Sequence, residues 1–167
     1  MYKKPPTILG INPGTRYMGI AVFQGNELRD WRIKGTKGKW NKKKLAKTLG
    51  IIEEYISHHK PNSVALKKIH SSRTSINLEQ LIAGIEKLAE KNEIQVCLYS
   101  GKEIKAHFLG GSKGNKRKLS EAITKQHPEL FHELIREKSN KNLYYTKLFE
   151  AVALGLICHH KLQDKVN

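Results

Sequence analysis

The stretch over residues 8–23 most constrains how this chain can fold. An apolar run ends at Asn12, a Pro13-Gly14 turn follows, and a second apolar run begins at Gly19. Apolar runs bounded by turn-forming residues are typical of buried strands joined in a hairpin. The stretch therefore predicts two buried strands, with the polar residue Asn12 at the end of the first.

The remaining elements follow from apolar periodicity and turn residues. Strands are predicted over residues 28–34, 63–66 and 94–99, and a Gly/Lys-rich loop over residues 35–44. Helices are predicted over residues 45–56, 78–88, 104–108, 119–126, 128–137 and 144–161. The centre of the last helix is apolar almost all round, as expected of a helix packed against a sheet. Three early strands followed by alternating helices and strands predict an α/β fold. Its mixed sheet has three antiparallel N-terminal strands and then parallel strands, and helices flank it. The length fits one domain over residues 1–167, with a basic tail over residues 1–6.

The charge points to a polyanionic partner. Thirty-one Lys and Arg residues stand against fifteen Asp and Glu residues, a formal net charge of +16. Such an excess favours nucleic acid as the partner. The lysines gather in two blocks, namely Lys37, Lys39, Lys42, Lys43 and Lys44, and Lys113, Lys116, Arg117 and Lys118. Trp40 lies within the first block and is a candidate for base stacking, whereas Trp31 is expected in the core.

Composition also bears on location. The chain has no apolar run long enough to span a membrane and no apolar N-terminal stretch of the kind a signal peptide needs. Cys97 and Cys158 lie in apolar segments and are expected to be buried free thiols. We therefore expect a cytoplasmic, nucleic-acid-associated protein.

Several motifs resemble those of one nuclease family. The run Gly10-Ile11-Asn12-Pro13-Gly14-Thr15-Arg16 resembles the Gly-Ile-Asp-Pro-Gly-Thr-Arg opening of Holliday-junction resolvases of the RuvC type, which have a ribonuclease H-like fold. Ala65-Leu66-Lys67 resembles the family's Ala-Ile-Glu strand end, and residues 104–119 resemble its Lys-containing loop before a helix. Residues 147–154 and His159 resemble its closing helix. By element order, the resemblance extends over roughly residues 7–160.

The resemblance implies four catalytic carboxylates that hold Mg²⁺ for phosphodiester cleavage. The matching positions are Asn12, Lys67, Lys147 and Glu150, which leave one carboxylate against two ammonium groups. At about 5 Å and an effective dielectric near 20, one Lys opposes a dication by roughly 7 kcal/mol. We therefore expect no catalytic residues, no bound metal and no cofactor.

The resulting hypothesis is a RuvC-like pseudo-nuclease of DNA recombination and repair. It would bind nucleic acid, branched DNA such as Holliday junctions above all, without metal-dependent cleavage. The expected phosphate contacts are Arg16, Lys67, Arg73, Lys105, Lys113, Lys116, Arg117, Lys118 and Lys147. The resemblance also implies a homodimer, since a junction presents two symmetric strands. Its interface would use apolar helix faces such as the one over residues 78–88.

Alternatives remain for the altered site and for the function. Lys67 and Lys147 either hold phosphate or have drifted at a site without activity. An active structure-specific endonuclease would need Mg²⁺ on displaced carboxylates, such as Glu79, Glu103 and Glu150. Glu79 and Glu103 also suit the first turns of helices. A third possibility is a non-catalytic partner of an active resolvase. The pairs His58-His59 and His159-His160 are expected at helix C-termini.

Overall fold

The computed structural model describes residues 4–35, 37–111, 114–139 and 144–166. Its strands are β1 (Thr7–Asn12), β2 (Tyr17–Gln24), β3 (Glu27–Gly35), β4 (Ser63–Lys68) and β5 (Gln95–Ser100). Its α-helices are α1 (Lys42–His59), α2 (Ile76–Lys91), α3 (Gly101–Leu109), α4 (Lys116–Gln126), α5 (Phe131–Ser139) and α6 (Tyr144–Val166). Single 3-10 turns form at Ser71–Arg73 and Pro128–Leu130.

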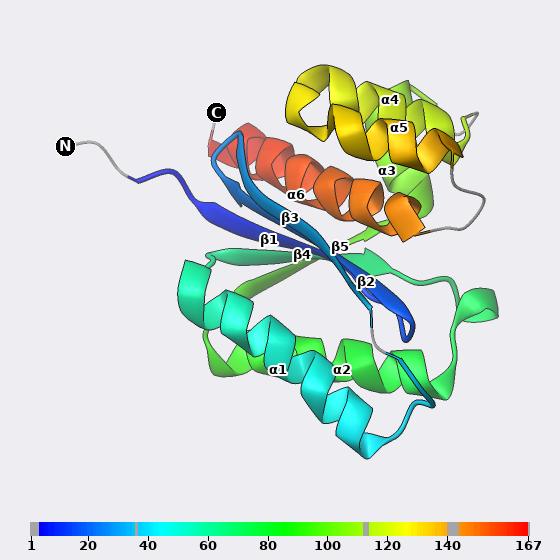
Figure 1. Ribbon diagram of the computed structural model, residues 1–167. Helices are drawn as coiled ribbons and strands as arrows, with labels where there is room; N and C mark the ends of the chain where they lie inside the picture. The colour runs from blue at the N-terminus through cyan, green and yellow to red at the C-terminus, as the bar shows by residue number, and fades with distance from the viewer. Residues whose placement is uncertain (1–3, 36, 112–113, 140–143, 167) are drawn as a thin grey trace.

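The five strands form one mixed sheet in the order β3-β2-β1-β4-β5. The first three strands pair antiparallel, and β1 pairs parallel with β4, which pairs parallel with β5. Helices α1 and α2 cover one face, while α6, with α3, α4 and α5 beyond it, covers the other (Figure 1). The predicted α/β fold, with antiparallel strands first and parallel strands after them, is confirmed.

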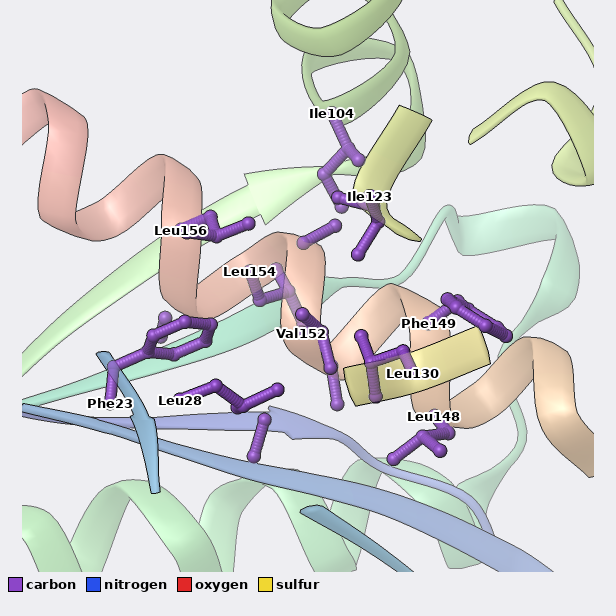
Figure 2. Close-up of a cluster of buried hydrophobic side chains, with 14 of the residues drawn as sticks. Phe23, Leu28, Ile104, Ile123, Leu130, Leu148, Phe149, Val152, Leu154 and Leu156 are labelled. Carbon is purple, nitrogen blue, oxygen red and sulfur yellow. The ribbon is translucent and has the colours of Figure 1, made fainter. Parts of the chain in front are cut away.

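Each face of the sheet has its own apolar core, because side chains alternate along a strand. On β2, Ile20 and Val22 pack with α1 and α2, whereas Ala21 and Phe23 pack against α6. Figure 2 shows the core on the α6 face of the sheet, where Val152 lies beside Leu130 and Phe23 lies beside Leu28. Residues 148–159 of α6 are all buried, as the apolar centre of that helix predicts.

Most helices extend a few residues beyond their predicted bounds, and the predicted helix over residues 128–137 is a 3-10 turn followed by α5. The predicted loop over residues 35–44 is wrong at its end, because Lys42, Lys43 and Lys44 form the first turn of α1. The side chain of Asn41 accepts a hydrogen bond from the Lys44 backbone N–H and caps this helix. Three lysines beside the positive end of the helix dipole are electrostatically unfavourable, and the apolar periodicity, which begins at Leu45, predicts a later start.

The C-terminal helix is longer than predicted, because α6 continues to Val166. His159 and His160 therefore lie within α6, and their expected role at a helix C-terminus is wrong. His159 is buried, and its Nδ1 atom has no hydrogen-bond partner among the described residues. By contrast, His58 and His59 lie in the last turn of α1, as predicted.

The apolar stripe over residues 78–88 is not a free surface. Leu81 and Ile85 are fully buried against the sheet, and Leu78, Ile82 and Leu88 pack around the same core. The expectation that this stripe forms a dimer interface is therefore wrong: the stripe attaches α2 to its own sheet.

Two smaller predictions concern single residues. Trp31 packs against the core, as expected, and its Nε1–H donates to Glu133 at 3.2 Å. Both cysteines are free thiols, but only Cys158 is buried, while Cys97 is half-buried on the edge strand β5. Among the described residues, no helix is both long and apolar enough to cross a membrane.

Candidate functional site

Two parallel strands end side by side and place Asn12 and Lys67 at one edge of the sheet. Ile11 of β1 pairs with Leu66 of β4, so Asn12 and Lys67 are the next residues of neighbouring strands. Ile11 and Leu66 pack in the core on the α1–α2 face. Because side chains alternate along a strand, Asn12 and Lys67 point to the opposite face, which α6 covers.

The N-terminal half of α6 contributes Lys147 and Glu150, which are three residues apart and so lie on one side of the helix. Two glycines let the helix backbone rest directly on the strands. A Cβ at Gly19 would overlap the carbonyl oxygen of Lys147, and a Cβ at Gly10 would overlap that of Ala151. This close approach brings the two α6 side chains to the strand ends, 138 positions after Asn12 in the case of Glu150.

Glu150 is the centre of a buried polar network. Its Oε2 atom accepts a hydrogen bond from Asn12 Nδ2 at 2.9 Å and forms an ion pair with the Lys67 ammonium. Its Oε1 atom lies 3.7 Å from Lys116 Nζ. The Glu150 side chain is 8% exposed, so the carboxylate is held by its neighbours and not by water. Three of the four positions predicted to match the family's carboxylates are thus joined through Glu150, which contacts both Asn12 and Lys67.

Lys147 completes the site from one turn earlier on α6. Its Nζ atom donates a hydrogen bond to the Pro13 carbonyl at 3.2 Å. Burial lowers the pKa of Lys147, Glu150 raises it in part, and the charges of Lys67 and Lys116 lower it further. Lys147 is therefore one of three ammonium groups that surround the single carboxylate of Glu150.

The side chains of this site do not fit a pair of Mg²⁺ ions. Hard cations need several oxygen ligands, yet both Glu150 oxygens face ammonium groups and Asn12 turns its NH₂ toward the carboxylate. The buried Asn12 Oδ1 is the remaining acceptor without a hydrogen-bond partner among the described residues. Nor do the described residues contain any group of three His, Cys, Asp or Glu side chains that could hold a metal. Glu79 and Glu103 instead lie in the first turns of α2 and α3.

A cleft of about 1090 Å³ opens beside this network, between the end of β4, the 3-10 turn at Ser71–Arg73 and the start of α3. Cationic side chains dominate its lining, with Glu103 as the one carboxylate among the lining residues. The basic residues that line it are Lys67, Lys68, Arg73, Lys102, Lys105 and Lys147. Walls that concentrate one sign of charge raise the local concentration of a polyanion.

The structure brings together some of the predicted phosphate contacts and separates others. Four of them line the cleft, namely Lys67, Arg73, Lys105 and Lys147. Lys116 reaches the same site through Glu150. Arg16 is exposed in the turn between β1 and β2, while Arg117 and Lys118 are exposed on the first turn of α4. Lys113 lies outside the described residues.

Sequence reasoning missed two basic residues of the cleft, Lys68 and Lys102. Lys68 directly follows Lys67 at the end of β4. Lys102 lies in the first turn of α3, after the cap in which Ser100 accepts a hydrogen bond from the Glu103 backbone N–H at 3.1 Å. The Ser-X-X-Glu pattern over residues 100–103 is the signal that could have found this helix start beside the strand end.

The first lysine block lies elsewhere. It leads into α1, which covers the face of the sheet opposite α6 (Figure 1). Lys44 is 9% exposed, donates to the Gly38 carbonyl at 2.8 Å and lies over the Trp40 ring at 5.7 Å. Trp40 packs against the core on this face. Both side chains thus have partners within the chain, which weakens the case for Trp40 as a base-stacking residue.

Comparison with known proteins gives one family. The family model described as "Crossover junction endodeoxyribonuclease RuvC" matches residues 8–129. A protein of this name from Saccharopolyspora erythraea is 25% identical over 127 residues, which cover 71% of this chain and 64% of that protein. One from Prochlorococcus marinus is 28% identical over 123 residues, which cover 70% of this chain and 78% of that protein. The match thus spans less than two thirds of the first of these relatives.

Solved structures agree on the fold. Thermus thermophilus RuvC superposes with a TM-score of 0.71 at 15% identity, covering 94% of this chain and 96% of that one. The same protein in complex with a Holliday junction substrate gives a TM-score of 0.72 at 15% identity, covering 97% of this chain and 96% of that one. The ribonuclease H-like fold is therefore confirmed, and it extends over α6, which the family match does not reach.

Proposed function

Because this chain belongs to the RuvC family of crossover junction endodeoxyribonucleases, we propose that it binds branched DNA without cleaving it by a metal-dependent reaction. A Holliday junction is the favoured ligand, since the Thermus thermophilus protein of the same fold forms a complex with one. The observation that carries the proposal is the closed network of Asn12, Lys67 and Glu150. In that network the Glu150 carboxylate is paired with the Lys67 ammonium and the Asn12 amide. These residues lie where the family resemblance implies metal ligands.

The basic cleft supports the binding half of the proposal. A DNA strand in it would meet Lys67, Arg73, Lys102, Lys105 and Lys147 within one continuous surface. Each phosphate that such a group neutralises releases condensed counterions, which supplies most of the affinity for a polyanion. No base-reading side chain is needed for a ligand that is recognised by its shape.

The network supports the non-cleaving half. In a metal-dependent nuclease, carboxylates hold cations that activate water and stabilise the leaving oxygen. Here Lys67 and Lys147 supply positive charge directly, so a phosphate can be attracted without a metal. The same groups leave no ligand set to activate water, and the proposed role is therefore to hold DNA and not to cut it.

A symmetric junction is matched by a symmetric protein, so the proposal includes a homodimer that acts in DNA recombination or repair. The interface does not use the apolar stripe of α2, which is buried within the subunit. Light scattering of the purified protein at high concentration, with and without junction DNA, tests this part. A strictly monomeric protein in both conditions would contradict it.

Two assays on the same protein test the central proposal. Fluorescence anisotropy in EDTA compares a four-way junction with duplex, single-stranded DNA and RNA, and we expect the junction to bind tightest. Gel analysis then follows the labelled junction in excess protein with Mg²⁺ or Mn²⁺, and we expect no specific products. Nicks near the crossover that disappear with EDTA would contradict the proposal, as would equal affinity for all four nucleic acids.

A further inference from the structure

We propose that Lys67 and Lys116 form a subsite for one phosphodiester group of DNA. In the absence of DNA, the Glu150 carboxylate occupies this subsite as an internal anion. The inference rests on the proposed function and extends it, because it names how the altered site accepts DNA. In the free protein the two ammonium groups neutralise Glu150. On binding, they turn toward a DNA phosphate at the mouth of the site.

The geometry separates a fixed part from a movable part. Asn12 is 1% exposed, the Glu150 side chain is 8% exposed, and a hydrogen bond of 2.9 Å joins them, so they remain in place. The side chains of Lys67 and Lys116 are 21% and 44% exposed, and they approach different oxygens of the same carboxylate. Long lysine stems allow both ammonium groups to move outward without any change in the backbone.

The charges leave room for one monoanion. One carboxylate balances one ammonium group, so the trio of Glu150, Lys67 and Lys116 carries a surplus of one positive charge. A phosphodiester carries one negative charge and would bring the summed charge of this trio to zero. A deeply bent strand can bring such a group to the trio, whereas the outer cations of the cleft, such as Arg73 and Lys102, serve any DNA.

Glu150 therefore weakens binding as a competing anion. Its removal frees both ammonium groups for phosphate and removes a repelling charge a few ångströms from the ligand. At about 6 Å and an effective dielectric near 40, one unit charge changes the affinity on the order of tenfold. The gain should depend on the two lysines and should be largest for DNA that reaches the trio.

The test is the junction affinity of Glu150→Gln, measured by anisotropy in EDTA at several salt concentrations. We expect about tenfold tighter binding than wild type and a log–log salt slope steeper by about 1. The matched control is Glu54→Gln, an exposed residue on α1 with the same change of charge on the opposite face of the sheet. It should bind as wild type does. A linear duplex should gain less than the junction.

A mutant cycle tests the dependence on the lysines. In a Lys67→Gln, Lys116→Gln background, Glu150→Gln should bring a smaller gain than in wild type, because only the removal of the repelling charge is left and the ammonium groups it would free are absent. An equal gain in that background, or unchanged affinity of the single variant, would overturn the inference while leaving the proposed function intact. No junction binding by wild-type protein would overturn both. If thermal melting shows that Glu150→Gln is unfolded, Glu150→Asp replaces it, because the shorter side chain cannot reach both lysines. A gain over wild type then supports the subsite, and no gain overturns it.

Discussion

The side-chain amide of Asn12 donates a hydrogen bond to the Glu150 carboxylate at 2.9 Å, from the end of the first strand to the last helix. An amide at this position is compatible with a neighbouring carboxylate in the absence of metal, because it offers a donor. An aspartate would place two negative charges in contact and would need cations between them. Asn12 and Lys67 thus both suit the Glu150 carboxylate, which accepts a hydrogen bond from one and pairs with the ammonium group of the other.

Asn12→Asp should lower the stability of the folded protein. The change replaces a buried hydrogen bond with a repulsion between carboxylates, and we expect a loss of about 1–3 kcal/mol. Urea unfolding at pH 7 in EDTA measures it. The control is Asn26→Asp, the same change at an exposed residue after β2, which should have little effect. Equal stability of the two variants would contradict the role of the Asn12–Glu150 bond.

Restoring the family's carboxylates should restore binding of Mg²⁺. The variant with Asn12→Asp, Lys67→Glu and Lys147→Asp places four carboxylates around the site together with Glu150. In EDTA its melting temperature should fall, and Mg²⁺ should raise it because the ion binds the folded state. Wild-type protein should melt at the same temperature with and without Mg²⁺. An equal rise for wild type would show that the native site does hold the ion.

Binding of the junction should fall steeply with salt. A log–log slope shallower than about −3 would imply fewer than about four neutralised phosphates and would contradict the extended basic cleft. Lys102→Gln with Lys105→Gln, both lining the cleft, should make the slope less steep by about 2. Lys87→Gln with Lys91→Gln is the matched control, since both lysines are exposed toward the C-terminal end of α2. That pair should leave the slope nearly unchanged.

Cys97 should react as a thiolate near neutral pH. A hydrogen bond from Cys158 outweighs partial burial and, with a weaker hydrogen bond from Tyr99, lowers the pKa of Cys97. The fraction of thiolate rises with pH, so alkylation of Cys97 by iodoacetamide should reach half its maximal rate at a lower pH in the folded protein than in the unfolded chain. Cys158, whose pKa is raised, should stay unmodified. Cys158→Ala should move the midpoint upward, and a wild-type midpoint near that of the unfolded chain would contradict this arrangement.

The sequence predicted most of the fold, because the relevant signals are local. The apolar runs around Pro13-Gly14 and the apolar stretch of α6 leave few alternatives for strands and for a buried helix. The start of α1 was misplaced, since its capping residue Asn41 is followed by three lysines that oppose the helix dipole. The stripe on α2 shows another limit. Periodicity identifies an apolar face but does not say whether the sheet or a partner covers it.

The candidate site could be predicted only in part. The motif resemblance brought Asn12, Lys67, Lys147 and Glu150 to one place, and the structure brings these residues together. The motif resemblance could not give the hydrogen-bond and ion-pair partners of these residues, because those contacts join residues far apart in the chain. Lys67 pairs with Glu150 across 83 positions, and Lys147 bonds the Pro13 carbonyl across 134. Lys68 and Lys102 line the cleft because β4 ends at Lys68 and because the cap of α3 places Lys102 in its first turn. A list of charged residues does not reveal these positions.

The most direct test of the account is the affinity of the Lys67→Gln, Lys147→Gln variant for a four-way junction in EDTA. Glutamine keeps a polar side chain of similar length and removes two of the three positive charges around Glu150. The account predicts binding weaker by about tenfold or more and a salt slope less steep by up to about 2, relative to the Lys87→Gln, Lys91→Gln control. If the two variants match in affinity and in slope, Lys67 and Lys147 do not hold phosphate, and the altered site has no part in binding DNA.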